Sequence, residues 1–149
     1  MKRTTALYIL TLLLAVFAGA APASAQNVLL KFGTLTPGDS DRSFPLAITV
    51  DAQGRIIVAE NSDTSSYIQV FDSGGKFLFK FGSNGTGDGQ FLGPGDVAVD
   101  RQGNIYVADS IFNNRVQKFD PTGKFLMKFG SNGTGDGQFG SLFGIVVDG

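Results

Sequence analysis

Apolar residues along the chain fall into short runs that recur with a nearly fixed spacing. Three of these runs end in an aspartate, at residues 48–51, 97–100 and 145–148, and lie 49 and 48 positions apart. A Gln-Gly turn follows the first two, and then a run rich in β-branched and aromatic residues, at 55–60 and 104–109. Such runs predict central strands that are buried on both faces. The spacing therefore indicates a repeat protein built of short strands.

Two further strands complete each repeat. Residues 68–71 and 116–119 alternate between apolar and polar side chains, which predicts a half-exposed third strand. After a tight turn, Asp-Ser-Gly-Gly or Asp-Pro-Thr-Gly, residues 76–81 and 124–129 combine lysine with phenylalanine, as on an exposed outer strand. Four antiparallel strands per repeat of this length are typical of a propeller blade. The predicted fold class is all-β, a β-propeller.

Asp51 and Asp100 end the first strand of their repeats, and each precedes the turn that contains Gln-Gly. A carboxylate in this position can accept hydrogen bonds from amides that the turn leaves unpaired, with a contribution of about 1–2 kcal/mol. Both aspartates are therefore predicted to have a local structural role.

One glycine-rich stretch occurs twice, letter for letter, at residues 80–91 and 128–139. It does not fit a phosphate-binding loop, because a strand and not a helix follows it. It does not fit a calcium loop either, because the bidentate acid would fall on Gly95. We interpret the stretch as a connection between blades that uses positive φ angles.

Several segments of the second repeat resemble the NHL repeat. They are Gly-Asn-Ile-Tyr-Val-Ala-Asp at 103–109, Asn-Asn-Arg-Val-Gln-Lys-Phe at 113–119, Gly-Lys-Phe-Leu-Met-Lys-Phe-Gly at 123–130 and Gly-Asp-Gly-Gln-Phe at 135–139. The resemblance covers residues 29–149 and implies a member of a six-bladed β-propeller family. The WD40 repeat is excluded, because the chain has no tryptophan or histidine. The first repeat departs from the NHL pattern at 62–66, where the asparagine and arginine are missing.

The start of the chain has the composition of a secretory signal peptide. Lys2 and Arg3 precede an apolar run at 6–20, and small residues lead up to Ala25. The alternative is a membrane anchor, but the run is shorter than the roughly 20 residues that a span needs. We predict cleavage after Ala25 and a secreted or periplasmic protein with no stable membrane span.

The predicted organisation is a signal peptide at 1–25 and a propeller segment at 26–149, with repeats at about 45–93 and 94–141 and partial blades at 28–44 and 142–149. About two and a half blades cannot close a ring, since four blades would need about 190 residues. We expect the chain to be the front of a longer protein, so that the remaining blades belong to the same chain. The alternative is a ring that several copies close together.

Charge and residue content exclude some function classes. The net charge is -1, and cleavage of the signal peptide leaves 10 basic and 13 acidic side chains. This balance offers no basic face for nucleic acid, so no nucleic-acid partner is expected. The chain has no cysteine or histidine, and any metal site must therefore consist of oxygen ligands, as for calcium.

Glu60 and Asp109 occupy equivalent positions at the end of the second strand and are the candidate metal ligands. Acids from several blades can converge on a propeller channel and hold calcium. The NHL resemblance instead implies that Asp109 pairs with Arg115 inside its own repeat, where the first repeat has Tyr67. We favour this structural role, because a residue present in each repeat is poor evidence for a unique site. The candidate binding-loop residues are Asn61, Asp63, Ser110, Asn113 and Asn114.

Three function classes follow from these observations. We favour a non-catalytic scaffold without a cofactor, whose loops bind a protein, peptide or glycan. The alternative is a calcium-type propeller enzyme, because six-bladed propellers similar to NHL proteins include lactonases and amidoglycolate lyases. The lyase resemblance implies histidine ligands for zinc, which this chain lacks, whereas a lactonase-like site stays open. RNA binding, known among NHL proteins, ranks last because of the acidic charge.

Overall fold

The structure is a computed structural model, and it describes residues 43–62 and 64–148. In these ranges the chain forms ten strands: β1 (Ser43–Val50), β2 (Ile56–Ser62), β3 (Ser66–Phe71), β4 (Phe77–Phe81), β5 (Ser83–Asn84), β6 (Gln90–Phe91), β7 (Pro94–Val99), β8 (Ile105–Asp109), β9 (Arg115–Phe119) and β10 (Phe125–Phe129). None of the described segments is a helix long and apolar enough to cross a membrane. The predicted signal peptide, the partial blade up to residue 42 and Asp63 lie outside the described residues.

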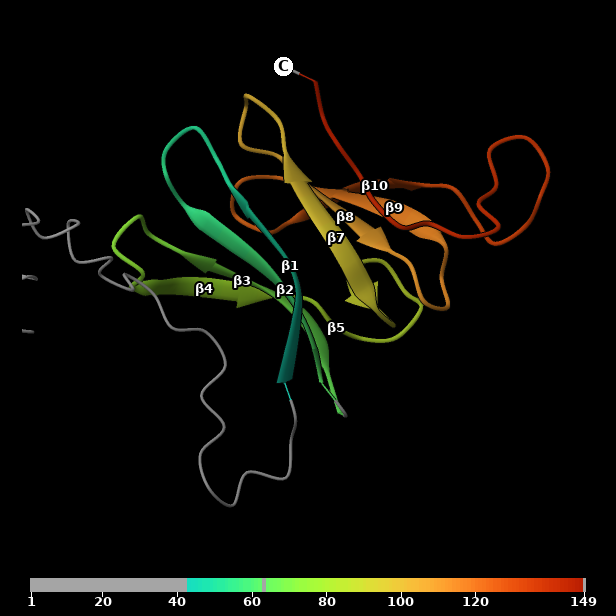
Figure 1. Cartoon of the computed structure of the whole chain (residues 1–149), viewed down its shortest axis with the longest axis horizontal. Helices are drawn as coiled ribbons and strands as arrows, with labels where there is room; N and C mark the ends of the chain where they lie inside the picture. The colour runs from blue at the N-terminus through green and yellow to red at the C-terminus, as the bar shows by residue number, and fades with distance from the viewer. Residues whose placement is uncertain (1–42, 63, 149) are drawn as a thin grey trace, which may run out of the picture.

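Eight of these strands form two four-stranded antiparallel sheets in simple meander order, β1-β2-β3-β4 and β7-β8-β9-β10, and β5 and β6 form a short parallel pair. We call them the first and the second blade. Figure 1 shows that the blades fan apart from the place where β1 and β7 lie side by side, with β4 and β10 on the outside. This arrangement confirms the predicted all-β propeller with an incomplete ring.

The exposure of the strands follows their place in the blade. β2 and β8 are buried along most of their length, and β10 is almost entirely exposed, as predicted for central and outer strands. β3 alternates between buried and half-buried side chains, as predicted. β9 is more buried than its sequence predicts, and Gln117 is fully buried, because residues 83–90 cover it.

Phenylalanine rings hold the two blades together. Phe119, at the end of β9, lies 4.8 Å from the ring centroid of Phe81 in the first blade and 5.7 Å from that of Phe91 in the connection. It also meets Phe125 of its own blade edge to face at 6.0 Å. Phe119 and Phe91 are fully buried. The largest side chains of the core therefore lie between the blades and tie one to the other.

The two identical stretches adopt the same conformation. We call residues 82–90 the first glycine loop and residues 130–138 the second. Gly82, Gly85 and Gly89 have φ angles of 94°, 146° and 75°, and the equivalent glycines of the second loop have 83°, 154° and 73°. At Gly82, a β-carbon would also overlap the ring of Phe91. The predicted use of positive φ is confirmed, and the conformation is a property of the stretch itself.

Candidate functional site

Asp109 is the centre of a buried hydrogen-bond network at the end of β8. Its carboxylate is fully buried, and Oδ1 accepts hydrogen bonds from the amides of Leu92 and Gly93, at 2.9 and 3.2 Å. Oδ2 accepts from Asn113 Nδ2 at 2.6 Å and from Arg115 Nε at 3.4 Å. Both oxygens are therefore occupied by donors from the loops and from β9. The pairing with Arg115 that the NHL resemblance implies is present.

Arg115 and Gln117 project from β9 and hold the first glycine loop. The guanidinium of Arg115 donates to three backbone carbonyls, those of Thr86 at 2.6 Å, Gly87 at 2.9 Å and Gln90 at 2.9 Å. The side chain of Gln117 accepts from the amide of Gly89 at 2.9 Å and donates to the carbonyl of Gln90 at 2.7 Å. Sequence reasoning missed this contact, because Arg115 and Gln117 lie 25 or more residues along the chain from the backbone groups that they bind.

Glu60 is buried like Asp109, but its surroundings differ. Its Oε1 accepts a hydrogen bond from Gln69 Nε2 at 3.3 Å, and its strand partner is Tyr67, which takes the place of Arg115. Lys80 lies over the Tyr67 ring, 4.8 Å from its centroid. Within the residues that the structure describes, no three acidic side chains gather into a group that could hold a metal.

Asn61 does not lie in a loop, contrary to the sequence-based assignment. It belongs to β2 and pairs with Ser66, whose hydroxyl donates to Asn61 Oδ1 at 2.8 Å. The strands extend this far because a tight serine turn closes them, in which the Ser62 amide donates to the Ser65 carbonyl at 2.7 Å. Side-chain hydroxyls that bond the nearby backbone stabilise such turns. The sequence did not predict this strand pairing, because residues 60–66 are all polar and do not alternate with apolar side chains.

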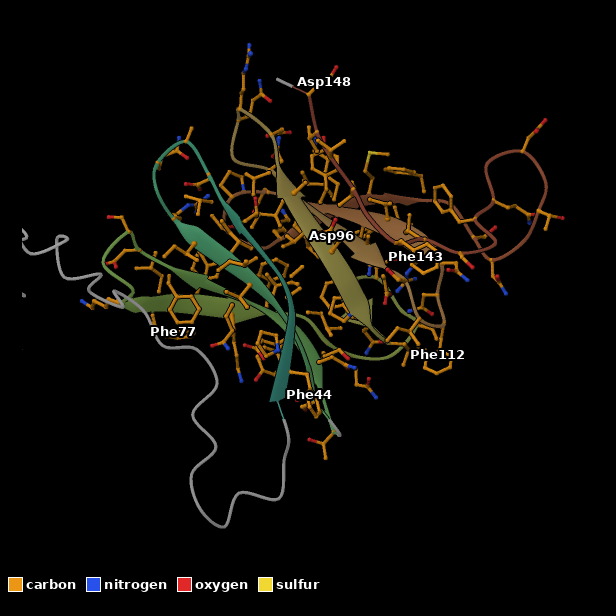
Figure 2. The ribbon with its side chains drawn as sticks, viewed as in Figure 1. Phe44, Phe77, Asp96, Phe112, Phe143 and Asp148 are labelled. Atoms are coloured by element: carbon orange, nitrogen blue, oxygen red, sulfur yellow. The ribbon has the colours of Figure 1, made fainter. Side chains whose placement is uncertain are left out.

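Ser110 and Asn114 line a cavity of about 410 Å³ at the loop end of the second blade. The other lining residues are Gly95, Ile111, Gly140, Ser141, Leu142 and Phe143. Asn114 has a positive φ of 43° and donates from Nδ2 to Asn132 Oδ1 at 3.0 Å. Phe143 is 89% exposed, and Figure 2 shows it on the same side of the molecule as Phe112, which is 69% exposed. We call this cavity and its rim the loop-end face.

The aspartates that end the first strands have the predicted local contacts. Asp51 Oδ1 accepts from the amides of Gln53 and Arg55, and Asp100 Oδ1 accepts from the amides two and four residues further on. Arg55 also forms a 2.6 Å ion pair with Asp51 and donates to the carbonyl of Pro121 in the second blade. The turn after β1 therefore also links the first blade to the second blade through Arg55.

The stability contribution of Asp100 should depend on pH. Burial alone would raise the pKa of this carboxyl, but hydrogen bonds from Asn104 and the nearby Lys118 ammonium hold the pKa below its usual value. A carboxyl whose pKa is lower in the folded state stabilises the protein above its unfolded pKa, and this contribution is lost as the pH falls through the folded pKa. We expect Asp100→Asn to lower the free energy of unfolding by about 1 kcal/mol at pH 7, and this deficit to shrink as the pH falls through the lowered pKa of Asp100 in the folded state.

Urea unfolding at a series of pH values measures this difference. Asp136→Asn is the matched control, because Asp136 is exposed in the second glycine loop, and it should match the parent at every pH. A deficit of Asp100→Asn that was the same at pH 7 and in the acid-most solution in which the protein is still folded would contradict the assignment of the charged turn.

Comparison with known proteins agrees with this fold. The model of a family described as a 6-bladed beta-propeller matches residues 47–113. Protein lin-41 of Caenorhabditis elegans is 40% identical over 55 residues, which are 37% of this chain and 5% of lin-41. The chain thus spans only a small part of the length of this curated relative. Together with the two four-stranded blades, these similarities confirm the β-propeller fold of the described residues and agree with the resemblance to the NHL repeat.

Proposed function

We propose that this protein is a secreted or periplasmic, non-catalytic binding scaffold that works without a cofactor. Its ligand is a protein, peptide or glycan segment that docks on the loop-end face of the second blade. The observation that carries the proposal is the set of hydrogen bonds that the Asp109 carboxylate accepts. Four donors from the loops and β9 occupy its carboxylate, which leaves the best candidate for chemistry with a bracing role.

The loop-end face has the composition of a binding surface. The cavity of about 410 Å³ combines hydroxyl and amide groups with the apolar side chains of Ile111, Leu142 and Phe143. Ligand sites commonly pair a mostly apolar lining with a few polar groups that orient the ligand. Aromatic side chains such as Phe143, which is 89% exposed, add much contact area at low entropic cost. A neutral polar and aromatic rim favours an uncharged peptide or sugar segment over nucleic acid.

A random peptide library displayed on phage tests the proposal. We expect clones enriched on the mature protein to lose binding to Phe143→Ser and to keep it with Phe44→Ser, a matched control on β1 of the first blade, where Phe44 is 49% exposed. Figure 2 labels both residues. Loss of binding in both variants, or no enrichment, would contradict the proposal. The same preparation tests export, because protein from the periplasmic fraction should begin at Gln26.

A further inference from the structure

Each glycine loop contains an asparagine that is directly followed by a glycine. The pairs are Asn84–Gly85 and Asn132–Gly133, and both asparagines are exposed. In such a pair the backbone nitrogen of the glycine can attack the side-chain amide carbon of the asparagine, because no side chain on the glycine hinders the approach. The reacting atoms belong to neighbouring residues, so the ring closes within one chain. The repeated stretch therefore holds two candidate sites of covalent modification with the same local sequence.

The two asparagines differ in the side chain that contacts them. Asn132 Oδ1 accepts a hydrogen bond from Asn114 Nδ2 at 3.0 Å. The repeat equivalent of Asn114 is Ser66, whose hydroxyl donates to Asn61 instead. Within the described ranges, no side chain donates to Asn84 Oδ1. This difference comes from the residue types of the two blades, since serine in the first blade stands where the second has asparagine.

The backbone of Asn114 fixes this donor in place. Asn114 has a φ of 43°, and among the described residues it is the one non-glycine residue with a positive φ. Asparagine adopts this left-handed conformation more readily than most other residues. The residue is also buried, with 8% of its surface exposed. A donor that is held in position before a reaction can stabilise a developing negative charge without rearranging.

We propose that Asn132 is deamidated by attack of the Gly133 nitrogen and that Asn114 promotes this reaction. The Gly133 nitrogen forms a bond to Cγ of Asn132, and the negative charge that develops on Oδ1 is stabilised by the Asn114 amide. The bond between Cγ and Nδ2 then breaks, and ammonia leaves with the proton that the Gly133 nitrogen gave up.

The product of ring closure is a succinimide, and water opens it. Addition of water at the former Cγ breaks the new bond and gives aspartate at position 132. Addition at the main-chain carbonyl carbon breaks the original peptide bond and gives isoaspartate, in which the chain runs through the side chain. Both products carry a negative charge where the parent has a neutral amide.

This position stays exposed when another blade follows it. The second blade follows Asn84 and packs against the first glycine loop, yet Asn84 is exposed. The equivalent Asn132 has the same place in an identical stretch. Figure 1 shows the second glycine loop, in orange-red, reaching outward from the end of β10.

A backbone hydrogen bond must open in either loop before the glycine nitrogen can react. The amide of Gly85 donates to the Phe91 carbonyl at 2.9 Å, and the amide of Gly133 donates to the Phe139 carbonyl at 3.2 Å. The first loop is also held by side chains from β9, which makes its opening harder. We therefore expect Asn132 to convert faster than Asn84, and the contribution of Asn114 has to be measured at Asn132 itself.

Deamidation would change the charge of the loop-end face. Asn114 lines the loop-end cavity, and the residues that line it are all neutral. A carboxylate at position 132 would lie beside Asn114 and give this face a negative charge.

Peptide mass spectrometry of the mature protein, sampled during incubation in mildly alkaline buffer, measures both sites. Trypsin separates them, because the peptides that begin after Lys80 and after Lys128 differ beyond the shared stretch. Asn114→Gly keeps the left-handed backbone conformation and removes the donor. We expect it to slow the conversion of Asn132 about tenfold, since one hydrogen bond to the developing charge is lost, and to leave the rate at Asn84 unchanged.

Phe112→Ala, at the exposed tip of the same loop, is the matched control and should convert like the parent. A variant that only loosened the fold would speed up both sites, so the ratio of the two rates identifies that case. The proposal would be overturned by an Asn132 that stays unconverted in the parent, or by Asn114→Gly converting Asn132 at the parent rate or faster.

Discussion

Replacing Asp109 with asparagine is expected to lower the free energy of unfolding of the mature protein by about 3 kcal/mol, because it leaves a buried arginine without its counter-charge. All four partners of the present carboxylate are donors, two on each oxygen. The asparagine NH2 group must face two of them whichever way the amide is turned, so at least one buried hydrogen bond is lost as well. Urea unfolding followed by circular dichroism measures the change.

Glu60→Gln is the matched control for this experiment, because Glu60 is the repeat equivalent of Asp109 and pairs with Tyr67 in place of an arginine. We expect it to cost about 1 kcal/mol. Calorimetric titration with calcium chloride should give no binding heat for the parent or for either variant. Calcium binding by the parent that Glu60→Gln abolishes would contradict the scaffold and favour the metal-dependent class.

Truncation of Phe119 to alanine is expected to destabilise the protein by about 4 kcal/mol, since it removes a large ring from the packed centre between the blades. Phe119 is 1% exposed, and its ring contacts those of Phe81, Phe91 and Phe125. The cavity would open between the two sheets, next to Phe81 and Phe91. Thermal and urea unfolding of the mature protein measure the loss.

Phe129→Ala is the control for Phe119, because both end a strand of the second blade but Phe129 is 43% exposed. Its truncation should cost less than about 1 kcal/mol. Equal losses for the two variants would show that the packing between the blades does not carry the stability of this segment.

The two repeats also differ in the side chain at the position of Arg115. In the second blade Arg115 reaches the first glycine loop, whereas in the first blade Tyr67 takes this place and interacts with Lys80. Arginine supplies several donors in a fixed plane and tyrosine supplies one. The two blades therefore carry chemically different side chains at this equivalent position.

Local chemistry explains what the sequence by itself determined about this protein. The four-strand repeat follows from alternation and from turn residues, and these act within a few positions of each other. The contacts of Asp51 and Asp100 were predictable for the same reason, since their partners lie two and four residues away. The glycine loops also carry their conformation in their own residues, and both copies fold alike.

Only the tertiary structure decided the contacts that join one blade to the next. Arg115 and Gln117 bind carbonyls more than twenty residues away, and Gln117 is buried in a strand whose alternation predicts exposure. The loop-end cavity combines Ser110 with residues 140–143 for the same reason. These contacts depend on how two sheets pack against each other, and the hydrophobic pattern of a single strand contains no information about its neighbour across the blade interface.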